Sequence, residues 1–386
     1  MAEEILGSVV WFLLFFVFIF IYPRLMLSQL IYQLEQSASK LEEMSKKSNR
    51  ICAKKIAPKP SKELQDKIDE FTDFFVVEPS SLDPYGIVHK IDQTIRSMEN
   101  RFTEFTDEIA SGKSDKEKQE INYALRASIG VRQISKIVRH YVELTKKFKN
   151  LQIAMILKMQ LPIIEKIAKG ELKGTESFVN GWPIGDSIGP LVATSMMEKS
   201  RVIAEDVVMA EEKIEGRKCF ILKATGPSPH LGRVDEAINK IMKRNKIARV
   251  ITIDAAGKLE GEKTGTVAEG VGFAMGGIGQ RELIENVLLP KKIPIDSVVV
   301  KVGMTEAIEP MKKDIYDAYP KTVEYVKKAV KRTKKTDKLI IIGIGNSCGV
   351  GNDKSAVESV KKVVEELHKK EEERKKKKGK KKNDEE

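Results

Sequence analysis

The chain has 386 residues, of which 41% are apolar and 32% charged, and its formal net charge is +12. This length predicts two or three domains with a sizeable core. The positive charge favours an anionic partner such as a lipid surface, RNA or DNA, although much of the excess lies in the C-terminal tail. Three widely spaced cysteines, Cys52, Cys219 and Cys348, exclude a disulfide framework and a CxxC metal site, and they indicate a reducing compartment.

A membrane anchor is predicted at the N-terminus. Residues 5–22, ILGSVVWFLLFFVFIFIY, carry no charge and, as a helix, match the hydrocarbon thickness of a bilayer. Acidic residues precede this run and no small-residue cleavage site is visible, so residues 1–24 predict an uncleaved anchor rather than a signal peptide. Basic residues follow it, and the positive-inside rule then predicts a single-pass protein with its bulk in the cytoplasm: Arg24, Lys40, Lys46 and Lys47.

Residues 25–60 predict a juxtamembrane helix and a linker. Apolar residues recur there at helical spacing, which favours membrane-proximal self-association into a homo-oligomer: Leu27, Leu30, Leu34, Leu41 and Met44. Two prolines in APKPSKE, residues 57–63, mark the linker, and Ser61 is placed to cap the next helix.

Residues 61–170 have the pattern of a helical domain. Two apolar stripes predict long amphipathic helices that pack against each other as a hairpin or small bundle, with a break at SGKSDKEKQE. The first stripe contains Val88, Ile91, Ile95, Met98, Phe102, Phe105 and Ile109, and the second contains Ile134, Val138, Tyr141, Leu144, Phe148, Leu151 and Met155. Residues 151–167 are apolar but contain Lys158 and Pro162, so they predict a core helix rather than a second membrane span.

Residues 171–368 predict an α/β domain. Strands are expected at 207–214, 218–224, 249–254, 297–302 and 339–344, alternating with helices at 189–199, 234–245, 280–289, 322–333 and 354–368. This alternation is typical of a layered fold with a mostly parallel sheet. The Lys/Glu-rich tail, residues 369–386, predicts disorder; it would either bind an anionic partner non-specifically or only improve solubility.

Two aspartates are the leading candidates for chemistry. Asp186 lies in GWPIGDSIGPLV, a tight bend ahead of an apolar helix, and Asp254 ends the predicted strand ARVITID. Ligands and substrates of open α/β sheets gather beyond the carboxyl ends of the strands, where these residues are expected to meet. Paired carboxylates either bind a divalent metal or share a proton in acid/base catalysis, whereas each aspartate alone would be a helix cap or a loop residue.

These motifs resemble those of the spore germination protease family and its relatives, the hydrogenase maturation proteases. The shared pattern is an aspartate before a Gly-Pro-headed helix, a second aspartate in an IDA context, and a later loop with Gly277, Gly279 and Arg281. The resemblance, which covers roughly residues 178–290, implies a three-layer phosphorylase/hydrolase-like sandwich and assigns the site's acids to Asp186 and Asp254. No histidine follows at the position that the nickel-binding members would require.

The whole chain also resembles an uncharacterised archaeal family with one N-terminal anchor, known only as a domain of unknown function. The run IDAAGKLEGEKTGTVAEGVGFAMGGIG carries this resemblance. It implies a membrane location and assigns no activity.

Further candidates lie in two glycine-containing loops. In TGPSPHLGR, Gly226 and Gly232 would let an anion approach His230 and Arg233, although the segment also fits an ordinary helix-capping turn. The loop IGIGNSCGVGND places Gly345 at the end of a strand, but no later strand supplies the acid of a dinucleotide site. Cys348 in that loop has no neighbouring histidine and is interpreted as a packing residue.

The loop acids Glu260, Glu262 and Glu269 would either complete a divalent cation site with the two aspartates or remain solvated. Two functions are compatible with the sequence. One is a membrane-tethered hydrolase of the peptidase type that works through Asp186 and Asp254. The alternative is a non-enzymatic membrane scaffold that binds a ligand, a protein, the ribosome or anionic lipid.

Overall fold

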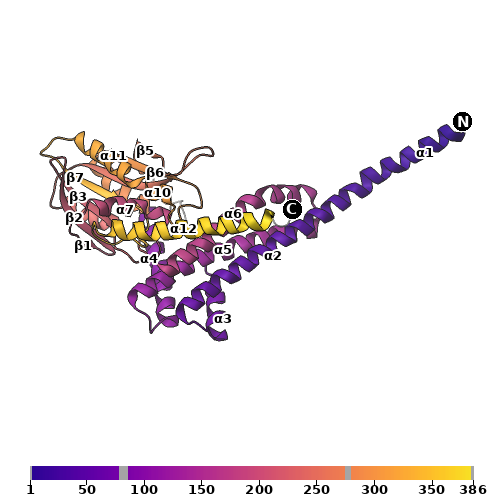
Figure 1. Ribbon diagram of the computed structural model, residues 1–386, viewed down its shortest axis with the longest axis horizontal. Helices are drawn as coiled ribbons and strands as arrows, with labels where there is room; N and C mark the ends of the chain where they lie inside the picture. Colours follow the sequence, from indigo (N-terminus) through magenta and orange to yellow (C-terminus); the bar gives the residue numbers. More distant parts are fainter. Residues whose placement is uncertain (1, 78–85, 274–279, 384–386) are drawn as a thin grey trace.

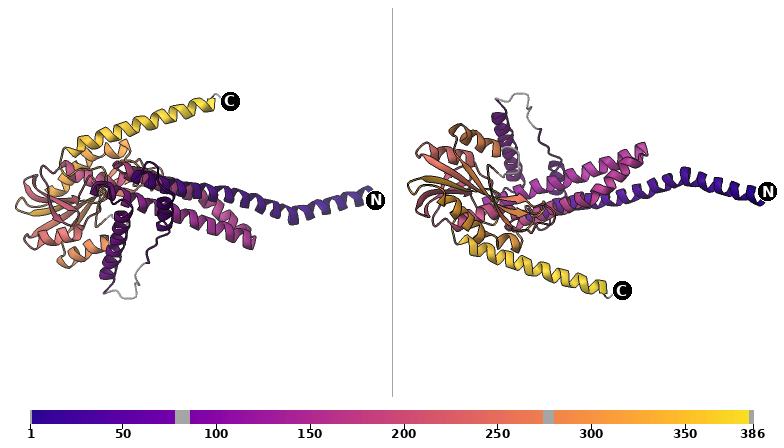
Figure 2. Two further views of the ribbon diagram at one scale, coloured as in Figure 1. Left: turned by 90° about the horizontal axis from the view of Figure 1, so that it is seen from below. Right: turned by 90° about the horizontal axis from the view of Figure 1, so that it is seen from above.

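The computed structural model describes residues 2–77, 86–273 and 280–383. Its helical part and its α/β part follow each other along the long axis, and the N-terminal helix projects far beyond both (Figure 1). The C-terminal helix leaves the α/β part and runs back in the direction of the N-terminus, apart from the helical bundle (Figure 2).

The N-terminal part is all helical. Its elements are α1 Ala2–Phe16, a π-helical turn η1 Val17–Ile21, α2 Tyr22–Ile56, α3 Lys62–Phe71, α4 Ile87–Ile109, α5 Asp115–Phe148 and α6 Leu151–Asn180. In the described part of the chain, one helix at the N-terminus is long and apolar enough to cross a membrane, and its apolar stretch is not buried against the rest of the protein.

Helix α2 packs along the hairpin formed by α5 and α6. Leu34 and Leu41 are fully buried against Val138, Val142 and Leu161, and Leu27, Leu30 and Met44 are partly buried in the same cluster. The leucine stripe that favoured self-association is therefore covered by helices of the same chain. The juxtamembrane segment thus belongs to the bundle and is not a separate stalk.

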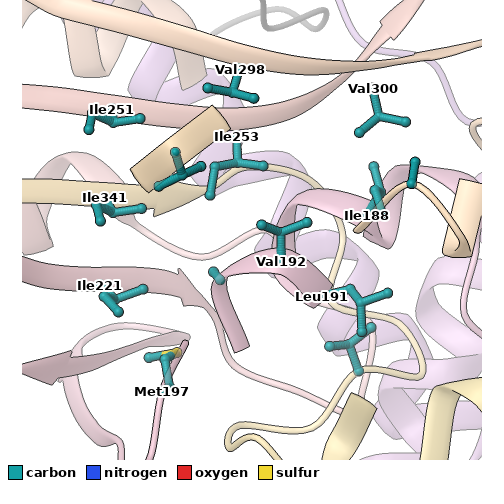
Figure 3. Close-up of a cluster of buried hydrophobic side chains, with 14 of the residues drawn as sticks. Ile188, Leu191, Val192, Met197, Ile221, Ile251, Ile253, Val298, Val300 and Ile341 are labelled. Atoms are coloured by element: carbon teal, nitrogen blue, oxygen red, sulfur yellow. The ribbon is translucent and has the colours of Figure 1, made fainter. Parts of the chain in front are cut away.

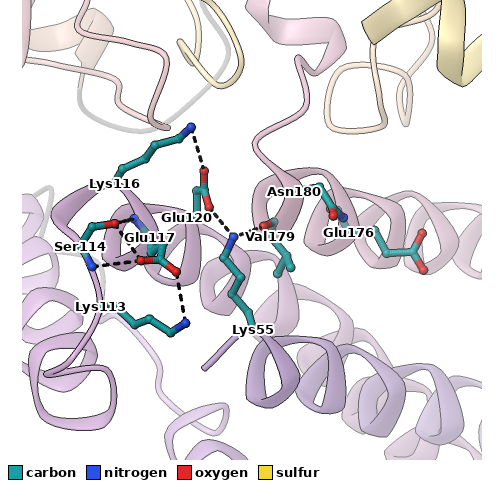
Figure 4. Close-up of polar contacts among 9 residues, drawn as sticks. All are labelled: Lys55, Lys113, Ser114, Lys116, Glu117, Glu120, Glu176, Val179 and Asn180. Carbon is teal, nitrogen blue, oxygen red and sulfur yellow. Dashed lines mark hydrogen bonds and ion pairs between the residues drawn. The ribbon is translucent and has the colours of Figure 1, made fainter. Parts of the chain in front are cut away.

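Local sequence signals determine where the bundle helices begin. Ser61 accepts a hydrogen bond from the backbone N–H of Leu64 at 3.1 Å, which confirms it as the cap of α3. Ser114 and Glu117 form a reciprocal capping box at the start of α5 (Figure 4). Helix α5 packs mainly on α2 and α6 and less on α4, so the helical part is a small bundle, one of the two predicted arrangements. Phe102 of α4 lies against Phe71 of α3 and against Phe74.

The C-terminal part contains one seven-stranded sheet in the order β1-β2-β3-β7-β4-β6-β5. The strands are β1 Arg201–Ala204, β2 Val207–Ile214, β3 Arg217–Ala224, β4 Ile247–Gly257, β5 Val267–Val271, β6 Ile295–Val302 and β7 Lys338–Gly343. Neighbours β3, β7, β4 and β6 are parallel, whereas β1–β2, β2–β3 and β5–β6 pair antiparallel. The predicted mostly parallel sheet is thus a mixed sheet. The consecutive strands β1, β2 and β3 form an antiparallel edge, and β5 pairs antiparallel with β6 at the other edge, although α9 lies between these two strands in the sequence.

Helices cover both faces of this sheet. Those of this part are η2 Gly185–Ser187, α7 Ile188–Ser195, α8 Val234–Met242, α9 Gln280–Leu288, η3 Leu289–Lys291, α10 Lys313–Tyr316, α11 Tyr319–Lys331 and α12 Ala356–Asn383. One core joins the sheet to α7, α11 and α12, and Figure 3 shows Ile188, Leu191 and Val192 of α7 facing Ile253 and its neighbours on the strands. The other core lies between the opposite face and helices α8 and α9.

Four elements depart from the sequence-based expectation. The short edge strands β1 and β5 were not predicted, and α6 continues through Gly170 to Asn180, so the α/β part begins later than the change in composition. Helix α12 extends through the tail that we expected to be disordered. Lysines lie four residues from glutamates along it, at Glu366–Lys370 and Glu371–Lys375, and such pairs stabilise an exposed helix.

Candidate functional site

Asp186 lies in the short helical turn η2, directly before α7. The backbone N–H of Asp186 donates to the carbonyl oxygen of Ala307 at 2.7 Å. Its Oδ2 accepts a hydrogen bond from the backbone N–H of Asn346, also at 2.7 Å, in the loop after β7. The carboxylate is therefore held between two loops from distant parts of the sequence, and it is half-buried.

Three glycines around Asp186 explain the composition of this bend. A Cβ atom on Gly189 would lie 2.0 Å from the carbonyl oxygen of Ile344 and 2.5 Å from that of Ile253, so only glycine lets α7 touch the ends of β7 and β4. A Cβ on Gly345, which has a φ of +113°, would lie 2.2 Å from the carbonyl oxygen of Asp186. Gly185 is equally close to the backbone of Glu306. The glycines thus fix the carboxylate at the carboxyl end of the sheet.

Asp254 lies near the end of β4 and is only 4% exposed. Strand β4 continues past it to Gly257, so Asp254 does not end the strand as predicted. Its Oδ1 accepts the backbone N–H of Ala255 at 2.7 Å. Ile253, the residue before it, pairs in register with Gly343 of β7, two residues before Gly345. The turn η2, which carries Asp186, contacts strand β4, which carries Asp254, so the two aspartates lie near each other at the carboxyl end of the sheet.

The electrostatics of the pair follow from this burial. Desolvation raises the pKa of Asp186 to about 6, against the opposing effect of the hydrogen bond from Asn346. Desolvation also raises the pKa of Asp254 well above its usual range, and the nearby negative charge of Asp186 raises it further. Both carboxyl groups have raised pKa values, and the charge of one raises the pKa of the other, which is the electrostatic arrangement of a carboxylate pair that can share a proton.

A buried lysine next to this region was missed by the sequence analysis. Lys223, on β3, is fully buried, and its Nζ donates to Oδ1 of Asn352 at 2.9 Å. Burial lowers the pKa of Lys223 to about 7. The same amide oxygen accepts the backbone N–H of Gly226 at 2.8 Å. A lysine within the apolar run CFILKA was the available signal, since a fully buried lysine is rare.

His230 and Arg233 lie in a different environment from the aspartates. Nε2 of His230 is 3.5 Å from Oδ1 of Asp206, and its Nδ1 is 3.1 Å from the carbonyl oxygen of Thr225. Arg233 is 7% exposed and forms an ion pair with Asp92 of α4 at 3.0 Å. One of its terminal nitrogens, NH2, is buried without a hydrogen-bond partner.

These two residues line a cavity of about 220 Å³ between α4, α5 and the β1–β2 turn. Its other charged or polar lining side chains include Arg96, Glu99, Asn100, Asn122, Tyr123, Arg126, Glu205 and Asp206. Neither aspartate of the pair lines it, nor does Gly226 or Gly345. The aspartate pair at the carboxyl end of the sheet and the polar cavity between the two parts of the chain are therefore two separate places.

Comparison with known families gives matches over most of the chain. Residues 8–181 match the family described as Protein of unknown function (DUF1512) N-terminal domain, and residues 184–351 match the Domain of unknown function (DUF1512) C-terminal. The chain belongs to the DUF1512 family. The two matches meet where α6 ends, so the N-terminal DUF1512 domain is the helical part and the C-terminal DUF1512 domain contains both aspartates. Neither the search of curated proteins nor that of solved structures found a match.

Four further candidates lie in the C-terminal DUF1512 domain: Gly277, Gly279, Arg281 and Cys348. Gly277 and Gly279 lie outside the described residues. Arg281 begins α9, is exposed, and forms an ion pair with Glu285 at 2.9 Å. Burial raises the pKa of Cys348, and its Sγ lies 3.1 Å from the carbonyl oxygen of Trp182, as suits a packing residue.

A metal site would need further ligands from outside the pair. Within residues 2–77, 86–273 and 280–383, no three His, Cys, Asp or Glu side chains cluster as metal ligands. Glu262 forms an ion pair with Lys301, and Glu269 forms one with Arg332 of α11, while Glu260 is exposed. These loop acids have basic partners or solvent around them. The arrangement of the described residues therefore suits proton sharing better than a dedicated metal cage.

Proposed function

We propose that this DUF1512 protein is a membrane-anchored hydrolase whose reaction is carried out by Asp186 and Asp254. The observation that carries the proposal is the mutual effect of the two carboxylates, both with raised pKa values, at the carboxyl end of one sheet. The ionised member would take a proton from water as it attacks a carbonyl carbon. The protonated member would hydrogen-bond to the developing oxyanion or give its proton to the leaving group.

The motif resemblance to the spore germination and hydrogenase maturation proteases is consistent with a peptide substrate. Asp186 precedes the Gly-Pro of α7, and Asp254 lies in the IDA sequence of β4, as that pattern requires. Helices on both faces of the sheet are compatible with the phosphorylase/hydrolase-like sandwich that the resemblance implies, although the antiparallel edges are an addition to it. The peptidase assignment and the sandwich family are part of this proposal.

The proposed setting is the cytoplasmic face of a membrane. The apolar N-terminal helix supports a single span, and the basic residues that follow it support an orientation with both DUF1512 domains inside the cell. Bilayer lipid is then a partner through α1.

Hydrolysis of a peptide library by the full chain in detergent or nanodiscs tests the activity. Asp186→Asn and Asp254→Asn are each expected to lower the turnover rate by a factor of about 100 or more, the range of lost acid/base catalysis. Asp66→Asn on the exposed face of α3 serves as the matched control and should retain full turnover. Equal turnover of wild type and Asp254→Asn would remove this residue from the mechanism.

The polar cavity at His230 and Arg233 favours a second function, a ligand-binding membrane scaffold. NH2 of Arg233 is buried without a hydrogen-bond partner and lies 3.9 Å from Oε2 of Glu99, so it could donate to an acceptor oxygen of a small polar ligand. Such a scaffold would show saturable ligand binding that Arg233→Met abolishes and that Asp254→Asn leaves unchanged. If the protein is instead the hydrolase, Asp254→Asn should lower the turnover rate and Arg233→Met should leave it unchanged.

A further inference from the structure

The closed end of the α5–α6 hairpin carries an exposed aromatic residue among lysines. Helix α5 ends at Phe148, whose side chain is 62% exposed, and Lys149 takes the left-handed conformation that reverses the chain. Nζ of Lys147 lies 5.5 Å from the centre of the Phe148 ring. Asn150 then caps α6 by accepting the backbone N–H of Ile153. An exposed phenylalanine with adjacent cations is poorly suited to water and well suited to a lipid–water interface.

This hairpin end lies beside the part of α2 that follows the predicted span. Helix α6 runs along α2 in the same direction, with side-chain partners at Gln33–Lys158, Lys40–Glu165 and Ser48–Thr175. These partners are separated by 125, 125 and 127 residues, so the first turn of α6 is level with the first turns of α2. Leu27 and Leu30 of α2 pack against the same hairpin. Both views in Figure 2 show the hairpin ending toward α1.

The distance from the bilayer is correspondingly short. Leu27 and Leu30 lie about 8–12 Å of helix rise beyond Tyr22, the end of the apolar run. The headgroup layer on one side of a bilayer is roughly 5–8 Å thick. The lysine side chains at the hairpin end therefore reach the lipid phosphates while the span is fully inserted.

Apolar exposure continues from this end along the outer face of α6. Met155, Ile156 and Met159 are 49%, 59% and 67% exposed, whereas Ala154 and Leu157 are buried in the bundle. Lys158 separates members of this apolar face. An interfacial helix has this combination of an apolar face with flanking lysines.

We propose that the closed end of the α5–α6 hairpin, residues 146–159, is a second membrane contact that binds an anionic lipid surface. Phe148 and the first turns of α6 enter the headgroup layer, and Lys147 and Lys149 bind lipid phosphates. This inference rests on the proposed anchoring by α1 and extends it, because two contacts hold the bundle at one angle to the bilayer where a single span leaves it free to rotate.

The test places an environment-sensitive fluorophore on the full-length chain in nanodiscs of phosphatidylglycerol or phosphatidylcholine. The fluorophore is attached at Phe148→Cys. Leu13→Cys in the span and Phe75→Cys beyond α3, a side chain 71% exposed, give the bilayer and water references. The native cysteines are buried, and burial raises the pKa of Cys52 to about 12 and of Cys219 to about 11, so they are poor competitors for the label.

The label at position 148 is expected to shift to shorter wavelength and to be quenched by nitroxide lipids in phosphatidylglycerol, while the label at position 75 stays unquenched. Lys147→Glu and Lys149→Glu should each weaken this contact roughly fivefold, and only in the anionic nanodiscs. Quenching at position 13 without quenching at position 148 would overturn the second contact and leave the anchor intact. Absence of quenching at position 13 would instead overturn the anchor and, with it, this inference. A shift at position 148 that persists in detergent, with disulfide-linked dimers of Phe148→Cys, would assign this face to a second copy of the chain and also overturn the proposal.

Discussion

The two neighbouring carboxyl groups are expected to make the free energy of unfolding depend on pH. The pKa of Asp186 is raised to about 6 in the folded protein, and that of Asp254 is raised further, whereas both return to about 4 when the chain unfolds. A raised carboxyl pKa favours the fold at low pH and loses this contribution as the pH rises through the folded-state value. Folding therefore pays an ionisation cost at neutral pH at these positions.

The double variant Asp186→Asn, Asp254→Asn is consequently expected to be more stable than wild type at pH 7.5, by about 1–3 kcal/mol. At pH 4 this advantage should largely disappear, because the carboxyl groups are then protonated in the folded state and about half protonated in the unfolded state, so little ionisation is lost on folding. Thermal unfolding from pH 4 to 8 measures the difference, with Asp66→Asn as the control that shows no such trend. A difference between variant and wild type that does not vary with pH would contradict the raised pKa values.

Glycine substitutions test how the crevice is built. Gly189→Ala would force α7 away from the ends of β4 and β7, with an expected loss of about 1–3 kcal/mol in unfolding free energy. Gly270→Ala in β5, where a Cβ would meet no atom within 4 Å, is the matched control and should not destabilise. Chemical denaturation of both variants makes the comparison, and equal losses would argue against the close approach of α7.

For single residues, the sequence indicated which side chains are candidates for function, but it did not indicate which other residues they contact. A single carboxylate among glycines, and another in an apolar strand, indicated Asp186 and Asp254 because such residues are rarely placed without a role. The sequence around His230 and Arg233 also predicted a binding site. In the structure, however, these residues lie in the polar cavity next to α4 and not with the aspartate pair. The helical domain that encloses them contributes Asp92 and Tyr123, and no local pattern around residue 230 encodes that contact.

At the scale of helices and strands, a buried ion pair joins α2, α5 and the end of α6. Nζ of Lys55 donates to Oε2 of Glu120 at 2.6 Å and to the carbonyl oxygen of Val179 at 2.6 Å (Figure 4). The side chain of Glu120 is only 5% exposed. Removing the lysine would leave a buried carboxylate and a helix-terminal carbonyl without their donor.

Lys55→Ala is therefore expected to lower the unfolding free energy by about 2 kcal/mol, the cost of losing hydrogen bonds to a charged group. Lys116→Ala is the matched control, since its Nζ is 3.9 Å from the other oxygen of Glu120 and its side chain is 59% exposed. The control should lose less than about 0.5 kcal/mol. Similar losses in the two variants would show that Lys55 is no more than a surface partner.

The elements also show why pairing was harder to predict than periodicity. The stripe from Ile134 to Phe148 correctly indicated an amphipathic helix, α5, but its last two members, Leu151 and Met155, belong to α6. A stripe also does not identify the helix that covers it, and α2 and α6 compete with α4 for that role. Strands β2 and β3 were predicted because their apolar runs are long. Strands β1 and β5 have four and five residues and largely exposed patterns, so their place in the sheet depends on the neighbours that they pair with.

The whole molecule makes a simple prediction about location. Deletion of residues 1–24 removes the apolar run and should move the protein from the membrane fraction to the soluble fraction, with the melting temperature of the remainder nearly unchanged. With the hairpin contact intact, the truncated chain should still bind anionic vesicles at low salt and be released at about 1 M salt, where charges are screened beyond about 3 Å. Resistance of the truncated chain to both salt and alkaline washing would contradict the single-span arrangement.

The continuity of α2 has a consequence for what the protein can act on. Its 35 residues form one helix that leaves the span and reaches the base of the α/β domain, a rigid spacer of about 50 Å. In the anchored state the aspartate pair is thus held far above the plane of the lipids. For the hydrolase and anchor proposed above, this height would exclude acyl chains and short juxtamembrane peptides as substrates and would favour soluble molecules and membrane proteins with large cytoplasmic parts.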